Sequence, residues 1–324
     1  MHVGIAGEVR CVVTKADGTV KTDTGFQKNL ILNQGLEFFG GGYGSSMFNN
    51  CVIGAGNSEP VVTQNRLDSF LAIAGASGFA KETDYVADGS NTYKTNRTGS
   101  YKFSGLGSIN ISEIGLASTG TTESNYYLCT RALIKDALGE PTTISLSGDE
   151  VLQVHYRIWQ VFDTTDKDEL INVKDGAGGL VAYKATHRLA AVGHPFSKYG
   201  AIVGMPFGAV PAGGYSEYNN FTTFSSGLVD LTTKQSDRDR LGVLSPNDYV
   251  IAPYIPLSNK RQVTFNFELT KGNGDIRTIY VPVTMGIFQI RYGTVDGDNP
   301  LTKTDKETLS IPLEFSWGRY EGEL

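Results

Sequence analysis

The sequence predicts a mainly β protein with two tandem antiparallel domains, each a β-sandwich or barrel-like unit. Residues 149–159 and 306–317 repeat one pattern, in which apolar side chains stand at every second position and the segment ends on tryptophan. Such alternation is typical of a half-buried strand. When Glu150 is aligned with Glu307, the superimposed apolar residues are Leu152, Val154, Tyr156 and Ile158 in one copy and Leu309, Ile311, Leu313 and Phe315 in the other.

Composition and length support this fold class. The chain has 39 Gly, 16 Tyr and 16 Phe, and only 19% of its residues are charged, which is unlike a helix-rich protein. With 324 residues it is longer than one typical domain, and a polar stretch at 163–169 marks its midpoint. We therefore predict one domain over residues 1–165 and a second over 166–324.

The first part of the chain predicts a hairpin, one short helix and one buried strand. Alternating apolar residues before and after Gly18 indicate a hairpin with Asp-Gly in its turn. Apolar residues crowd together without strand alternation over 29–39, which predicts a short helix that ends at three glycines. Residues 51–54 read as a short buried strand, and 64–73 as a second short helical or irregular segment.

The remaining strands follow at short intervals, separated by Gly, Ser and Thr. This spacing is typical of antiparallel sandwiches and barrels. Residues 271–275 predict a turn between two of the strands. The predicted strands are 93–103, 108–117, 126–135 and 150–162 in the first half and 249–255, 261–269, 276–284, 286–292 and 308–317 in the second.

A long segment at 195–227 combines Gly, Pro and Ser with many aromatic residues. Because disordered loops are poor in aromatics, we expect contact with another surface to order it. Three surfaces fit: the chain's own second domain, a neighbouring subunit, or a sugar on which the rings stack. We take the subunit contact as our interface hypothesis, with these candidate residues: Phe196, Tyr199, Phe207, Tyr215, Tyr218, Phe221 and Phe224.

Charge and cysteine usage limit the partners. The formal net charge of -6, without a Lys/Arg cluster, argues against nucleic acid and anionic membranes as partners. The longest apolar stretch, 201–214, contains Pro206, Pro211 and several glycines, so we expect no membrane insertion. The start of the chain has no secretion pattern, and its three cysteines are expected to be free thiols in a reducing cytoplasm.

The sequence offers no recognised catalytic or metal-binding pattern. His155 is expected to face outward from the core, and His187 and His194 lack the spacing of a zinc site. The acidic stretch at 163–169 and the turn at 296–299 both lack the spacing of a calcium loop. A nucleophile elbow and a phosphate-binding loop are also missing. We therefore expect no enzyme activity, no cofactor and no metal.

An ordered series of five short motifs runs through residues 29–162. They are an N-L-I-x-x-x-G-L opening at 29–36, a G-x-G-x-S-x-P loop at 54–60, E-I-G-L at 113–116, R-A-L at 131–133, and the strand at 150–159. This order resembles tail-associated structural proteins of tailed bacteriophages that form β-sandwiches. The second half matches only through its copy of the strand.

The motif residues themselves suggest structural roles. Gly54 and Gly56 permit a tight backbone path, and Pro60 stiffens its exit. Glu113 is expected to be the outward residue of its strand, with Arg131 as a candidate partner. We expect these positions to hold the sandwich together and not to form a site.

The resemblance implies a virion structural protein of the phage tail, made in the bacterial host cytoplasm. Its expected role is that of a ring, sheath, appendage or fibre-anchoring component. Such a protein forms a homo-oligomer and docks other tail structural proteins through buried surface. A receptor- or carbohydrate-binding module that recognises a host surface glycan is the alternative from another class, and a capsid decoration protein is a third.

Overall fold

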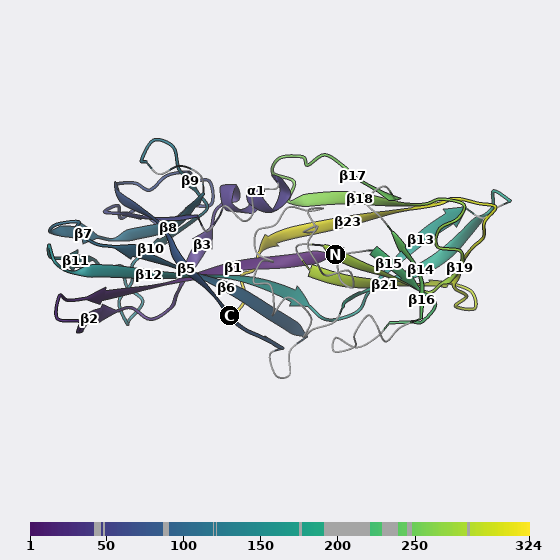
Figure 1. Ribbon diagram of the computed structural model, residues 1–324, viewed down its shortest axis with the longest axis horizontal. Coiled ribbons are helices and arrows are strands. Elements are labelled where there is room, and N and C mark those ends of the chain that lie inside the picture. The colour runs from purple at the N-terminus through teal and green to yellow at the C-terminus, as the bar shows by residue number, and fades with distance from the viewer. Residues whose placement is uncertain are drawn as a thin grey trace.

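The computed structural model confirms the mainly β fold, with 59% of residues in strands and 3% in helix. It describes residues 1–41, 47, 49–86, 91–118, 120, 122–174, 177–190, 221–228, 239–244, 248–283 and 286–324. The molecule is elongated, with a barrel at one end and a sandwich-like arrangement of sheets at the other (Figure 1). Of the long aromatic segment predicted at 195–227, residues 195–220 lie outside the described residues.

The elements of the first half are β1 (His2–Thr14), β2 (Val20–Asp23), β3 (Gln27–Ile31), α1 (Asn33–Gly41), β4 (Asn50–Gly54), β5 (Phe70–Val86), β6 (Thr92–Phe103), β7 (Ile109–Ile111), β8 (Glu113–Ser118), β9 (Tyr127–Leu128), β10 (Thr130–Leu133), β11 (Ile144–Leu146) and β12 (Val151–Asp163). Those of the second half are β13 (Lys167–Lys174), β14 (Leu180–Leu189), β15 (Phe221–Phe224), β16 (Arg240–Leu244), β17 (Tyr249–Ile251), β18 (Lys260–Phe267), β19 (Gly274–Ile276), β20 (Thr278–Val283), β21 (Gly286–Thr294), β22 (Leu301–Lys303) and β23 (Leu309–Arg319).

Eight strands of the first half close into an antiparallel barrel. Their order is β12-β6-β5-β4-β8-β10-β3-β1, and β1 pairs again with β12 to complete the circle. Closure matters because it leaves these strands without an unpaired edge. The inward residues alternate along each strand as the sequence predicts: Leu152, Val154, Tyr156 and Ile158 of β12 are all fully buried.

The second half contributes to two large sheets and forms a separate two-stranded sheet of β19 and β22. One is a six-stranded sheet in the order β13-β14-β21-β20-β15-β16. The other is a ribbon of β23, β18 and β17, which extends the sheet of the barrel because β23 pairs in parallel with the start of β1. Ring contacts between Phe162 and Phe288 and between Phe288 and Phe315 join the two sheets.

The tandem arrangement of two separate domains is not confirmed. The expected boundary at 165/166 falls between β12 and β13, but β23 lies beside β1, and one apolar cluster includes residues of both halves. The end of the chain also reaches back, because the Tyr320 N–H donates to the Ile5 carbonyl at 2.8 Å and Arg319 donates to Asn33. The two copies of the repeated strand, β12 and β23, thus flank the same strand, β1.

Most element predictions agree with the structure, with some differences in extent. The hairpin turns at Gly18, whose φ is 85°. The helix prediction was wrong at its start, because residues 29–31 belong to β3, and α1 covers only the later part. The prediction of a helical or irregular segment over 64–73 was wrong from Phe70 on, where the 17-residue strand β5 begins. The prediction of a single strand over 108–117 was wrong, because Ser112 separates β7 from β8. The β13–β14 hairpin was missed because its first strand is mostly exposed and charged, which hides the alternation.

Glu113 lies on the outer side of its strand as expected, but its side chain is fully buried, which was not expected. Glu113 does point away from the barrel interior, but the loop between β4 and β5 folds over it. Its carboxylate accepts N–H bonds from Gly56 (2.9 Å), Ser69 (2.8 Å) and Asp68 (3.1 Å). The expected pair with Arg131 is present at 2.9 Å, and Arg131 is also fully buried.

Arg131 completes this network with bonds to three side chains of the same loop. Its guanidinium donates to Gln64 (3.0 Å), Asp68 (2.8 Å) and Ser58 (3.4 Å). Both buried charges therefore have partners, which is the condition under which a buried ion pair is tolerated. The network fixes the 55–69 loop to the outer wall of the barrel.

Candidate functional site

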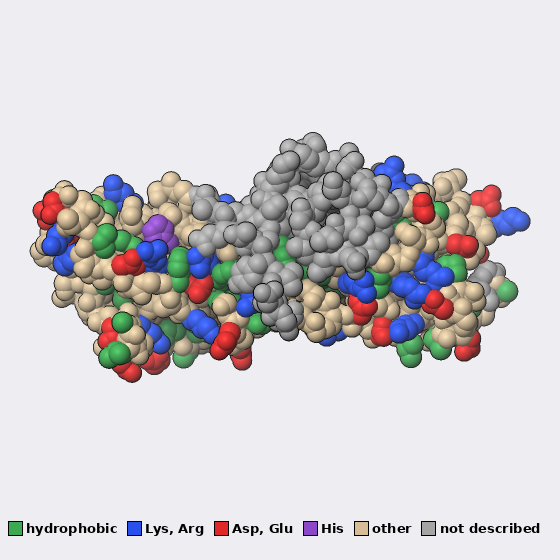
Figure 2. Space-filling view, turned by 90° about the horizontal axis from the view of Figure 1, so that it is seen from below, with side chains coloured by type: hydrophobic (Ala, Val, Ile, Leu, Met, Phe, Trp, Pro, Cys, Tyr) green, Lys and Arg blue, Asp and Glu red, His purple; other side chains and the backbone are tan. Residues whose placement is uncertain are grey.

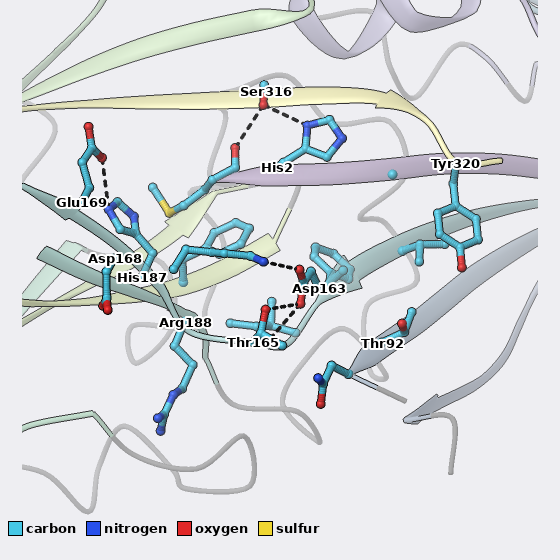
Figure 3. A pocket seen from close by; sticks show the side chains of 18 of the residues that line it. His2, Thr92, Asp163, Thr165, Asp168, Glu169, His187, Arg188, Ser316 and Tyr320 are labelled. Atoms are coloured by element: carbon cyan, nitrogen blue, oxygen red, sulfur yellow. Dashed lines mark hydrogen bonds and ion pairs between the residues drawn. The ribbon is translucent and has the colours of Figure 1, made fainter. Parts of the chain in front are cut away.

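A groove of about 970 Å³ lies where the barrel strands meet the six-stranded sheet, and we call it the junction groove. Figure 3 shows it between the start of β1, the end of β23 and the β13–β14 hairpin. Its position follows from topology, because β12 leaves the barrel and the chain enters β13 of the other sheet at this point. Labelled residues on its walls include His2, Asp163, Glu169, His187 and Tyr320.

His187 is the most deeply placed titratable side chain of the groove. It lies on β14, and its Nε2 is 3.5 Å from the Glu169 carboxylate on the neighbouring strand β13. Burial lowers the pKa of His187, and the amino group of Met1 lowers it further, whereas Glu169 opposes both effects. The neutral imidazole is therefore the favoured form in the folded protein.

The other charged groups around His187 are largely compensated. Lys167 contacts Asp163 at 2.6 Å, Lys184 contacts Asp168 at 2.8 Å, and Arg188 binds Asp166. The hydrogen bond from Lys184 lowers the pKa of Asp168 and so keeps it ionised. The walls are thus polar but nearly neutral in sum, which suits an uncharged polar ligand better than an ion.

The opposite wall carries a histidine–serine contact between the two terminal strands. The His2 Nδ1 lies 2.9 Å from the Ser316 Oγ, and Ser316 also bonds the Met1 carbonyl. Burial lowers the pKa of His2. Because both residues lie where β1 pairs with β23, this contact ties the ends of the chain together. Within the described ranges, no group of three or more His, Cys, Asp or Glu side chains is placed to hold a metal ion.

Of the seven predicted interface residues, the structure describes only Phe221 and Phe224. Phe196, Tyr199, Phe207, Tyr215 and Tyr218 lie outside the described residues, and so does His194. Phe221 begins β15. The Phe224 side chain is fully buried, and its ring centroid lies 6.4 Å from that of Tyr280 in an edge-on contact within the second half. This contact matches the alternative of packing on the chain's own second domain; the interface hypothesis itself stays untested.

Two further expectations concern the histidine and the cysteines. His155 is half-buried and contacts the Ser100 Oγ at 3.0 Å on the neighbouring strand β6. Cys11, Cys51 and Cys129 are buried, unpaired and spread over three barrel strands or their ends. Burial raises the pKa of Cys11 and Cys129 to about 12, so their thiols stay protonated.

Surface features that the sequence reasoning missed lie on the second half. Among the described residues, β13, β16 and β17 each pair on one side only, so each presents an open edge. Leu170 on β13 is 74% exposed and Val250 on β17 is 62% exposed; in the loop after β17, Ile255 and Leu257 are both 70% exposed. The sequence signal for Leu170 and Val250 is an apolar residue on the polar side of an alternating strand, whereas Ile255 and Leu257 lie in a loop without such a pattern.

Searches against protein-family models, curated proteins and solved structures found no match to this chain. In the described parts of the chain, no helix has the length and apolar character needed to span a bilayer. On the face shown in Figure 2, acidic and basic side chains are intermingled at both ends of the molecule.

Proposed function

We propose that this chain is a structural protein of a bacteriophage tail, which acts by binding copies of itself and neighbouring tail proteins. The observation that carries the proposal is the set of sheet edges on the second half that have no further strand beside them among the described residues, with exposed Leu170, Val250, Ile255 and Leu257 on or beside them. Unpaired edges and exposed apolar side chains are surfaces that a second chain can cover.

The motif series adds support from the first half. The loop at 54–60, Glu113 and Arg131 belong to three of the five motifs, and they meet in one hydrogen-bonded network. Motifs that belong to one structural unit are expected to contact one another in the folded chain. The resemblance to tail-associated proteins rests on that order and on no single motif.

Particle composition tests the proposal directly. Phage particles purified from a bacterial strain that carries the gene should contain the protein, in a few to a few dozen copies for a tail ring. Quantitative mass spectrometry of the particles measures that number. Hundreds of copies would instead indicate a capsid decoration protein, and absence from the particles would refute a virion role.

Self-association of the purified protein is the second measurement. Analytical ultracentrifugation over a wide concentration range should show species larger than a monomer, and electron microscopy should show closed or stacked assemblies. A protein that stays monomeric at every concentration would contradict self-assembly.

A glycan-binding module is the second candidate function, and the junction groove favours it. The groove is large, its charges are compensated, and Tyr320 stands on its wall as a ring on which a sugar can stack. A glycan array with the purified protein should then select particular neutral sugars, and Tyr320→Ala should abolish that selection. Lack of any selective binding would remove this candidate.

A further inference from the structure

The turn between β18 and β19 holds an asparagine against a lysine. The Nζ of Lys303, the last residue of β22, donates to the Asn273 Oδ1 at 2.7 Å. Its other two bonds go to the backbone carbonyls of Thr304 (3.1 Å) and Leu269 (3.4 Å). Because β19 and β22 pair in their own two-stranded sheet, with Lys303 opposite Gly274, the strand register itself brings the two side chains together.

Lys303 is buried without a negatively charged partner. Only 2% of its surface is exposed, whereas lysines are almost never fully buried unless they are paired. The three oxygens that accept its bonds are neutral, and no carboxylate of the described residues forms an ion pair with it. Burial lowers the pKa of Lys303, and the carboxylates of Glu307, Asp305 and Glu268 oppose this effect only from a distance. The ammonium group therefore lacks the countercharge that usually accompanies burial.

A carboxylate at residue 273 would supply that charge. One of its oxygens would replace the Asn273 Oδ1, which already lies within hydrogen-bond distance of the ammonium. The exchange loses the bond from the Asn273 Nδ2 to the Leu269 carbonyl (2.9 Å), because a carboxylate has no hydrogen to donate. The Lys303 Nζ also bonds that carbonyl, so the carbonyl keeps a donor. Attraction between opposite charges at this separation outweighs one neutral hydrogen bond where solvent is partly excluded, so the site favours a carboxylate over an amide.

The sequence at this contact permits such a conversion. Asn273 precedes Gly274, and this is the only Asn-Gly step in the chain. The backbone nitrogen that follows an asparagine can attack the side-chain amide, and intramolecular reactions of this kind gain greatly from proximity. Glycine has no Cβ to obstruct that approach. Asn273 is exposed, so ammonia can leave the site and water can enter it.

Lys303 assists both halves of the conversion. Attack on the Asn273 Cγ places negative charge on Oδ1, and a donor already aimed at that atom stabilises the charge. In the cyclic imide that results, the same donor polarises the side-chain carbonyl more than the backbone carbonyl. Water therefore adds to the side-chain carbonyl, which restores the normal backbone and leaves aspartate instead of isoaspartate.

We propose that Asn273 is a self-modification site, at which the chain exchanges an amide for a carboxylate that pairs with Lys303. The Gly274 nitrogen forms a bond to the Asn273 Cγ and loses its proton, while the bond from Cγ to Nδ2 breaks and ammonia leaves. A water molecule then adds to Cγ, the bond from Cγ to the Gly274 nitrogen breaks, and that nitrogen regains a proton. In sum, an amide and water give a carboxylate and an ammonium ion, without an oxidant or a further reactant. The inference does not depend on the proposed assembly.

Peptide mapping by mass spectrometry tests the reaction. Wild-type protein kept for weeks near neutral pH should convert Asn273 to aspartate, with isoaspartate as the minor product. The exposed Asn110 and Asn299 are internal controls, because isoleucine and proline follow them, and both should stay amides. In Lys303→Met the conversion should slow at least about tenfold, and the share of isoaspartate should rise. A residue 273 that remains an amide, or that becomes mainly isoaspartate in the wild type, would overturn the proposal.

A comparison of thermal midpoints tests the pairing. Asn273→Asp makes the product directly, and its effect on the midpoint should be more favourable, by about 2 °C or more, with Lys303 present than in Lys303→Met. The acidic side chains nearby repel the new charge in both backgrounds, so the difference isolates the pair. Asn110→Asp, exposed on β7 of the first half, is the matched control and should shift both backgrounds equally. An equal shift for Asn273→Asp as well would show that the carboxylate does not bind Lys303, which contradicts the proposal.

Discussion

The barrel of the first half and the six-stranded sheet of the second half treat their strand edges differently. The barrel joins β12 to β1, so each of its eight strands has two neighbours, and its outer wall is partly covered by the 55–69 loop. The six-stranded sheet ends at β13 and β16 among the described residues, and β17 ends the ribbon beside it.

The two halves also differ in where they place their charged and apolar side chains. In the barrel, charged groups such as Glu113 and Arg131 are buried and fully paired, which ties the wall together. In the second half, charges such as Asp168 and Lys184 remain about half exposed, and Leu170 and Val250 face solvent on strands that pair on one side only among the described residues. Closure thus favours stability in the first half, and in the described part of the second half the edge strands leave surface available for contacts.

The largest expected effect comes from breaking the buried ion network. Arg131→Met leaves Glu113 buried without its positive partner, which should reduce the free energy of unfolding by about 3–5 kcal/mol. Urea denaturation followed by fluorescence measures the loss. Arg10→Met is the control in the same barrel, because the Arg10–Asp23 pair is more than a third exposed on each side and should matter by less than about 1 kcal/mol. Equal losses of unfolding free energy in both variants would show that the buried pair in the barrel wall stabilises the fold no more than the exposed pair does.

A pair of glycine substitutions compares the packing of the two regions. A side chain at Gly115 on β8 would collide with the Thr130 carbonyl of the adjacent strand, so Gly115→Ala should destabilise by roughly 1–3 kcal/mol. At Gly242 on the edge strand β16 the nearest atom would be 3.5 Å away, which is ordinary contact, so Gly242→Ala should change stability little. Thermal unfolding of both variants checks the difference, and a greater loss at Gly242 would reverse the comparison.

The second half should respond to acid through His187. Because burial lowers its pKa in the folded state, the unfolded state binds more protons as pH falls below the ordinary histidine value of about 6.5. The contribution of the neutral imidazole to the free energy of unfolding is fully present above that pH and is lost as the pH falls below it. Glu169 and Asp168 face His187 and reduce this effect, the Met1 amino group increases it, and the β21 neighbour Ile290 is apolar.

His187→Gln should therefore reduce the fall in thermal midpoint between about pH 7.5 and 5.5. His155→Gln in the barrel is the matched variant, since His155 lies on β12 and contacts Ser100. Scanning calorimetry at both pH values measures the difference. An unchanged acid response in His187→Gln would mean that other groups govern it.

The smallest effect on stability is expected at Pro312. Ser316, four residues further along β23, donates its N–H toward β1, so the nitrogen of Pro312 points to the same side, where no strand pairs with it among the described residues. Pro312→Val therefore removes no hydrogen bond and should change the free energy of unfolding by less than about 1 kcal/mol. The new N–H extends the open edge, so non-specific association should increase, as measured by light scattering. A large loss of stability would place the proline in the interior of a sheet and contradict the edge assignment.

Period-two patterns made much of the fold predictable. Residues such as Val154 and Ile311 face a core because alternation puts them on one side of a strand, and neighbouring strands then cover that side. Local turn chemistry was equally readable, as at Gly18 and Gly297, whose φ values of 85° and 92° need glycine. The exposed strand β13 was not predictable, because its charged residues interrupt the alternation.

The candidate sites could be predicted far less well. The junction groove assembles residues from both ends of the chain, such as His2 and Ser316, and no local pattern relates them. Leu257 has no sequence signature either, because its exposure and positive φ depend on the distant Glu37. Glu113 shows the same limit, since its position on the outer side of its strand was foreseen and the loop that buries it was not.

The sequence by itself determined that this protein is built from strands, where the strongly alternating ones lie, and which side of each of these is apolar, because these properties depend on residues two to four positions apart. Only the tertiary structure decided that eight strands close into a barrel, that β23 lies beside β1, and which edges stay open. Those outcomes depend on pairing between segments up to 314 residues apart, such as His2 with Ser316, and alternation along one strand carries no information about its neighbour.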